Sequence, residues 1–331
     1  MIRALLNSTN EGNLLLSDQA MVPKLRLPFI KDGYRRPWLT PLECIKSVFH
    51  FHNETCNIWS HFIPFILLLG TYLRYFSENS IFNPLMWPLL CFVLLSSYVF
   101  LMSSFAHTLC VLSPKSVGLK GWSDTDMDDL FFSLDYAGIS MLNFGFGQGY
   151  IFYTGVSEST ASTYINLFLT VSIMASNGTT YMAITSYIYR EKMTTFTWQI
   201  FFVIPYMISV SPFLLRLYRN KIEENLSNMF FIQMFLFLLA ASLHGLKLPE
   251  RLAPGHFDYV GHSHNWMHVF TASGVFQNHY LFIHVLSTTD YLPMHSITIW
   301  NTFLVLLLCT FSNIAIVIVV FCHFRNRKQK N

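Results

Sequence analysis

Long stretches without a charged residue are the feature that most restricts how this chain can fold. A membrane-spanning helix needs about 20 predominantly apolar residues, because lipid neither solvates charges nor hydrogen-bonds exposed backbone groups. Eight windows meet or nearly meet this requirement, and they are centred on residues 58–75, 84–105, 130–152, 162–187, 196–215, 229–245, 264–286 and 297–322. The pattern predicts an all-α polytopic membrane protein, with a seven-helix bundle followed by an eighth C-terminal span.

The composition excludes several other classes of protein. The 331 residues are 53% hydrophobic and only 12% charged, whereas soluble domains carry about 25% charged residues. An ordinary soluble enzyme, a disordered regulator and a coiled coil are therefore excluded. The net charge of +3 is too small to indicate nucleic-acid binding. The six cysteines contain no Cys-x-x-Cys pair, so neither a disulfide framework nor a cysteine-based zinc finger is expected.

The distribution of Lys and Arg predicts the orientation of the chain. With eight spans and a cytoplasmic N-terminus, 17 of these residues fall in cytoplasmic segments and 4 in outside segments. Cytoplasmic loops are enriched in Lys and Arg, so both termini are expected inside the cell. We expect a cytoplasmic N-terminal segment (1–45), a seven-span core (46–288), an eighth span (289–324) and a basic cytoplasmic tail (325–331). The expected location is the plasma membrane.

Two histidines have a spacing that suits metal binding. His264 and His268 are separated by four residues at the start of the seventh window, so a helix presents both imidazoles on one face. The predicted topology brings His107, at the end of the second window, to the same side of the membrane. Asp135 lies just inside the third window on that side, and a carboxylate within a span is a functional candidate. These four residues suggest a metal centre with an adjacent proton acceptor.

A structural explanation of these residues stays open, because a chain with 13 histidines can contain such a pair by chance. His61 is expected at the membrane interface, where an imidazole costs little. His244 and His279 could be satisfied by hydrogen bonds between helices.

An acidic segment precedes the third window, and it contains Asp124, Asp126, Asp128 and Asp129. It is too short for an EF-hand and lacks both the central glycine and the closing glutamate. We expect a solvated acidic loop.

The candidate residues lie in three short sequence motifs: Ser103-Ser-Phe-Ala-His107, Leu134-Asp135-Tyr136-Ala-Gly138 and His262-Ser-His264-Asn-Trp-Met-His268. They resemble the signature motifs of the progestin and adipoQ receptor family. Segments 52–61 and 248–255 also resemble that family, and the likeness runs from about residue 34 to residue 269. The additional eighth span is similar to the membrane progestin receptor branch, and the loop before the seventh window resembles its gamma type.

The resemblance implies a role for each matching residue. His107, His264 and His268 would be zinc ligands, Asp135 would hold the metal-bound water, and Ser103 would line the site or stabilise a developing oxyanion. The wider superfamily includes alkaline ceramidases. The implied chemistry is therefore zinc-assisted hydrolysis of a lipid amide.

Three functions remain open on this basis. The first is a steroid-responsive receptor for progestin, signalling through a G protein or a released lipid. The second is a zinc-dependent amide hydrolase acting on ceramide or a similar sphingolipid. The third is a structural or trafficking membrane protein in which zinc only joins the helices. Membrane lipids are expected partners and nucleic acid is not.

Overall fold

The computed structural model describes residues 15–123, 125–155, 162–190, 195–219, 223–288 and 296–330. This part of the chain contains eight helices of 23 to 27 residues, one at each of the eight predicted windows. They are α3 (Thr55–Glu78), α4 (Trp87–Leu109), α5 (Asp126–Tyr150), α6 (Ser162–Ile188), α7 (Thr195–Tyr218), α8 (Glu224–Leu246), α9 (Ser263–Thr288) and α10 (Val305–Lys330).

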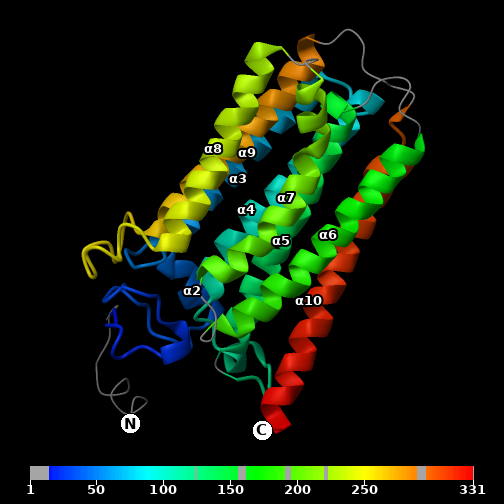
Figure 1. Ribbon diagram of the computed structural model, residues 1–331. Coiled ribbons are helices and arrows are strands. Elements are labelled where there is room, and N and C mark those ends of the chain that lie inside the picture. The colour runs from blue at the N-terminus through cyan, green and yellow to red at the C-terminus, as the bar shows by residue number, and fades with distance from the viewer. Residues whose placement is uncertain are drawn as a thin grey trace.

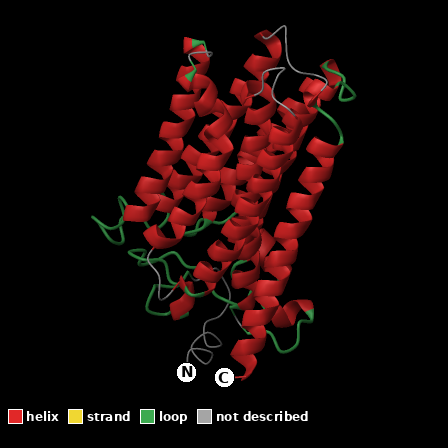
Figure 2. Cartoon of the chain, turned by 45° about the vertical axis from the view of Figure 1, so that its right-hand side comes forward, coloured by secondary structure: helices red, strands yellow, loops and turns green. Residues whose placement is uncertain are grey.

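The long helices run side by side in one bundle, and both ends of the chain lie at the same end of it (Figure 1). A short helix, α2 (Pro41–Ser47), precedes them, and no strand occurs within the described ranges (Figure 2). An even number of crossings explains why the termini share one side. The predicted all-α polytopic architecture is confirmed.

Six of the long helices are apolar enough to cross a membrane by length and composition, and the two that fall short are α5 and α9. Both lie beside the other long helices in the bundle and are about as long as they are (Figure 1). Helix α5 packs against α4, α6, α7 and α10, and 20 of its 25 residues are buried. A helix shielded from lipid by its neighbours can carry polar side chains that a lipid-facing helix cannot.

Glycines let α5 approach its neighbours closely. A Cβ atom added to Gly149 would lie 2.2 Å from the ring of Phe282 on α9, and one added to Gly145 would lie 3.1 Å from Leu95 on α4. The absence of a side chain at these positions permits the observed contact between helices.

The N-terminal segment before α3 folds across the end of the bundle. Arg35 donates to the backbone carbonyls of His107 and Thr108, which end α4 without intrahelical partners. Lys24 forms an ion pair with Asp129 at 2.6 Å, and the Lys31 amide donates to Asp258 at 2.9 Å. These contacts attach the segment to α4, α5 and the loop before α9.

The expectation of a solvated acidic loop is wrong for the described residues. Asp126, Asp128 and Asp129 lie in the first turn of α5 and are between 1% and 3% exposed. Arg190 pairs with both Asp128 and Asp129. Carboxylates are favourable at a helix N-terminus and can be buried where cations meet them, and only the tertiary structure supplies those cations. Asp124 lies outside the described residues.

Two of the expected segment boundaries fall within helices. Residue 45 is inside α2, so the N-terminal segment and the core are connected by a helix. Helix α10 continues through the basic tail to Lys330.

Candidate metal centre

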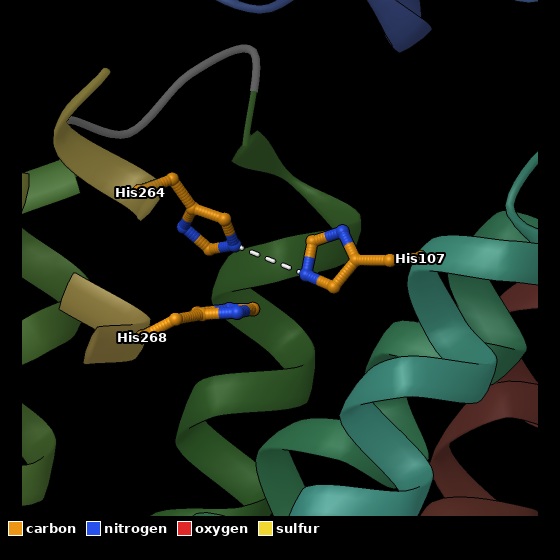
Figure 3. A group of neighbouring side chains, drawn as sticks. All are labelled: His107, His264 and His268. Carbon is orange, nitrogen blue, oxygen red and sulfur yellow. Dashed lines mark hydrogen bonds between the residues drawn. The ribbon is translucent and has the colours of Figure 1, made fainter. Parts of the chain in front are cut away.

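Three imidazoles from two helices converge at the end of the bundle that carries the termini. His107 comes from the last turns of α4, and His264 and His268 come from the first turns of α9 (Figure 3). One nitrogen from each ring lies within 4.8 Å of the other two. The Nε2 atoms of His264 and His107 are 3.1 Å apart. The i, i+4 spacing on α9 therefore faces a third histidine more than 150 residues away in the chain.

Hydrogen bonds orient two of these rings. The Nδ1 of His107 is 2.7 Å from a carboxylate oxygen of Glu54. The Nδ1 of His268 is 3.1 Å from the carbonyl oxygen of Asn57 and 2.9 Å from the hydroxyl of Ser60. With Nδ1 engaged, both rings turn Nε2 away from these partners and toward the shared space.

This arrangement fits a zinc ion. Catalytic zinc sites use three protein ligands with one open position, and three histidines are a known set. Two nitrogens bound tetrahedrally at about 2.05 Å would be roughly 3.3 Å apart, close to the 3.1 Å between His264 and His107. Metal-bound histidines usually donate their second ring nitrogen to a carboxylate or carbonyl. Glu54 and Asn57 supply those acceptors.

The contact of Glu54 with His107 is not predicted by the sequence. Burial acts to raise the pKa of Glu54, but His107, Asn57 and Arg35 outweigh burial and lower it, so the carboxylate stays ionised. Asn57 donates to Glu54 at 2.7 Å and accepts from Asn265 on α9 at 2.6 Å. The only hint in the sequence was that Glu54 lies in segment 52–61, which resembles the family.

Asp135 and Ser103 lie beside His107. Asp135 is 6% exposed, and its carboxylate interacts with His107 and Ser103. Ser103 lies one turn before His107 on α4 and is 1% exposed, and its hydroxyl forms no hydrogen bond of normal geometry. Both predicted catalytic residues are therefore buried beside His107, and neither is part of the cavity wall described below.

Further histidines surround the three. The ring of His61 stacks on that of His268 with 3.8 Å between centroids, and His244 and His262 flank His264. His61 is 6% exposed, so its side chain faces other parts of the protein, and its expected place at the membrane interface stays a prediction. His279 forms the predicted hydrogen bond between helices, with Tyr72 on α3. Burial in this low-polarity surrounding lowers the pKa of His262, which favours its neutral form.

Glu250 anchors the start of α9. It accepts a hydrogen bond from the Ser263 amide at 2.7 Å and another from the Ser263 hydroxyl. Glu250 forms no ion pair with Arg251 among the described residues, and Arg251 is exposed. The two bonds to Ser263 hold the start of the helix that carries His264 and His268.

A cavity of about 360 Å³ reaches this site from the end of the bundle. The N-terminal segment lines one side of it, and His107 and His264 are part of the opposite wall. Its volume lies in the range of small-molecule sites, about 300–1,000 Å³. A ligand in the cavity would be in contact with two of the three histidines.

Comparison with known proteins identifies the family. Residues 49–280 match the family described as haemolysin-III related. The chain belongs to this family. The match includes every residue of the candidate centre, so the resemblance to progestin and adipoQ receptors is confirmed.

Named relatives cover most of the chain. Human (Homo sapiens) membrane progestin receptor delta is 30% identical over 74% of this chain and 71% of its own length. Human membrane progestin receptor gamma is 28% identical over 72% and 71%. Heptahelical transmembrane protein 1 of Arabidopsis thaliana is 27% identical over 76% and 74%. The gamma and delta types are similar to this chain to nearly the same degree.

Proposed function

We propose that this integral membrane protein is a zinc-dependent hydrolase of lipid amides such as ceramide. The observation that carries the proposal is the convergence of His107, His264 and His268, with Asp135 beside them and a cavity leading to them. A structural zinc site needs neither a buried carboxylate next to its ligands nor a space for a ligand.

Each residue has a distinct part in this proposal. His107, His264 and His268 would hold zinc, which when bound supplies a Lewis acid and a water of lowered pKa. Glu54 would accept a hydrogen bond from the Nδ1–H of His107, which leaves Nε2 free to bind the metal. Asp135 would take a proton from the attacking water and return it to the leaving amine. The hydroxyl of Ser103 would donate to the oxygen that becomes negative during attack on the amide.

The zinc content of purified protein is the first test. Elemental analysis of the protein, prepared in detergent without chelator, should find one zinc per chain in the wild type and none in a His264→Ala/His268→Ala variant. His284→Ala removes a histidine from the other end of α9 and should retain the metal. Folded wild-type protein without zinc would contradict the proposal. Release of fatty acid from ceramide in the zinc-loaded wild type is the second requirement.

A steroid-responsive receptor is the second candidate, and the names of the relatives favour it. In this version a progestin regulates the protein at the plasma membrane, and the signal passes to a G protein or through a released lipid. Progestin binding should survive Asp135→Ala if the steroid pocket is separate from the histidine cluster. Loss of binding in a folded variant would locate the steroid at the cluster, and a wild type that binds no progestin would exclude this candidate.

The remaining alternative is a zinc that only joins α4 to α9. It predicts that Asp135→Ala leaves all properties unchanged while His107→Ala destabilises the protein. Loss of hydrolysis in a stable, zinc-loaded Asp135→Ala variant would exclude it.

A further inference from the structure

Lys247 contributes a positive charge to the cavity that the proposed chemistry does not use. It follows the last residue of α8 in a left-handed backbone conformation, with φ of 56°. Its side chain is part of the cavity wall, near His244 and His262, on the side that leads to His264. The lysine and the candidate metal centre thus face the same space.

No carboxylate neutralises this lysine at close range. Among the described residues, no Asp or Glu oxygen lies within 4.0 Å of the Lys247 ammonium. The nearest acid, Glu250, directs its carboxylate to Ser263 at the start of α9. Burial lowers the pKa of Lys247 to about 8, although Glu250 acts to raise it. Lys247 is half-buried, and an anion would stabilise a cation that is partly withdrawn from water.

Arg35 adds a second charge of this kind. Its guanidinium is 5% exposed and donates to neutral acceptors: two backbone carbonyls, the hydroxyl of Ser47 and the sulfur of Cys110. No carboxylate of the described residues lies within 4.0 Å of it. The cavity wall contains five Lys or Arg residues and three Asp or Glu residues, but Lys24 and Arg190 are paired with Asp128 and Asp129. Lys247 and Arg35 leave positive charge at the cavity that no carboxylate of the described residues offsets within 4.0 Å.

Two structural explanations account for only part of this. A cation near the C-terminus of a helix interacts favourably with the helix dipole, which explains a lysine after α8. A lysine can also extend its charge into water while its methylene groups cover apolar surface. Neither explanation accounts for the position of Lys247 in the wall of a cavity that also contains His244, His262 and His264.

We propose that Lys247 binds an anionic headgroup, a phosphate or a carboxylate, of the lipid amide that occupies the cavity. This rests on the proposed function for the identity of the ligand as a lipid amide, but binding can be measured without turnover. The ammonium would hold the charged end of the ligand on one side of the histidine cluster. The amide could then extend toward His264 and His107. Arg35, whose two terminal guanidinium nitrogens already donate within the protein, adds a favourable electrostatic field.

Matched pairs of lipids provide the test. Binding is measured on full-length protein in uncharged lipid nanodiscs, with Asp135→Asn present so that the ligand is not consumed. Ceramide 1-phosphate is compared with ceramide, and N-palmitoylglycine with N-palmitoylethanolamine. Each pair shares an acyl amide and differs in the anionic group, so the two pairs separate a phosphate site from a carboxylate site.

The expected result is that at least one anionic lipid binds about tenfold or more tightly than its neutral counterpart, as for a hydrogen bond to a charged group. Lys247→Met should abolish this preference and Lys247→Arg should retain most of it. Lys115→Met, at an exposed position remote from the cavity wall, should leave it unchanged. Thermal unfolding checks that each variant is folded.

Equal binding of the anionic and neutral lipids by the parent protein would overturn the inference, whatever the variants do. A preference that survives Lys247→Met would also overturn it. If the preference depends on Lys247 but zinc-loaded wild type hydrolyses none of the four lipids, the proposed hydrolase fails and the anion site stands. If hydrolysis occurs with no anionic preference, only the lysine assignment fails.

Discussion

The two ends of the helix bundle are built on different principles. At the end that carries the termini, α4, α5 and α9 bring histidines, carboxylates and a cavity together. Toward the other end, α5 and α9 meet each other and helices α7 and α8 through aromatic rings. Tyr150 contacts Phe213, Phe230 and Phe282 with ring centroids 5.3–5.9 Å apart, and all four side chains are fully buried. One set of helices thus has an ionisable end and a closely packed end.

This difference indicates that one end of the bundle contributes mainly to stability and the other mainly to binding. Aromatic burial stabilises the bundle without requiring any partner outside the chain. Buried imidazoles and an unpaired lysine cost free energy that the fold does not recover locally. We infer that aromatic packing at one end of the bundle stabilises the fold. The polar residues at the end with the histidine cluster, called the site end below, are there to bind a ligand. Mutations at the two ends should separate activity from stability.

The largest effect is expected from Asp135→Asn at the site end. Removing the proton acceptor should lower hydrolysis of ceramide on the order of 10²–10⁴-fold. Zinc content and the thermal unfolding temperature should stay near those of the wild type, because Asn has nearly the same shape. Unchanged hydrolysis in a zinc-loaded variant would remove Asp135 from the mechanism.

A smaller effect at the same end is expected from Glu54→Gln. The amide cannot hold the His107 tautomer as the carboxylate does, so zinc should bind about 10–100-fold more weakly. Competition with a calibrated chelator measures the affinity. Glu78→Gln, at the exposed far end of α3, is the matched control and should bind zinc like the wild type. Equal affinities for the two variants would break the assignment of Glu54 to the site.

Gly149→Ala tests the packed end. The new Cβ would meet the Phe282 ring, which other aromatic rings enclose, so the free energy of unfolding should fall by about 1–3 kcal/mol. Zinc content per folded molecule should not change. Gly178→Ala adds the same methyl group where nothing lies within 4 Å, and it should be neutral or slightly stabilising. Loss of zinc in Gly149→Ala would show that the two ends are coupled.

The charge of Lys247 predicts a pH dependence that only the site end should show. Its pKa of about 8 means that the ammonium is present below that pH and lost as pH rises through it. Binding of the preferred anionic lipid should therefore weaken above about pH 8. The groups that face this lysine are His244, His262 and Glu250, of which the histidines are already neutral there. Lys247→Arg should bind with nearly constant affinity up to pH 9, and a matching decline in that variant would assign the titration to another group.

The smallest effect is expected from Arg74→Ala at the far end of α3. Arg74 and Glu78 form an exposed i, i+4 ion pair at 3.2 Å, with side chains 83% and 62% exposed. Such pairs contribute about 0.5 kcal/mol or less to stability. Thermal unfolding, zinc content and lipid binding should all resemble the wild type. A large loss of stability would mean that the far end depends on more than aromatic packing.

The sequence alone was sufficient for the helices and for most of the candidate centre. Charge-free windows predicted all eight long helices, because the cost of burying charge in lipid acts on each segment separately. The spacing of His264 and His268, together with an even number of crossings, indicated that His107 and Asp135 would meet them. The prediction that these residues meet follows from the topology, because successive antiparallel helices bring alternate loops to the same side of the membrane.

Only the tertiary structure decided which neighbours each polar group meets. Burial of Asp128 and Asp129 depends on Lys24 and Arg190, which are distant in the chain. The contact of Glu54 with His107, and the place of Lys247 in the cavity wall, likewise arise from segments that no sequence period connects. Helix formation in a membrane is governed by local hydropathy. The partner of a buried charge is set by long-range packing, which a single sequence leaves undetermined.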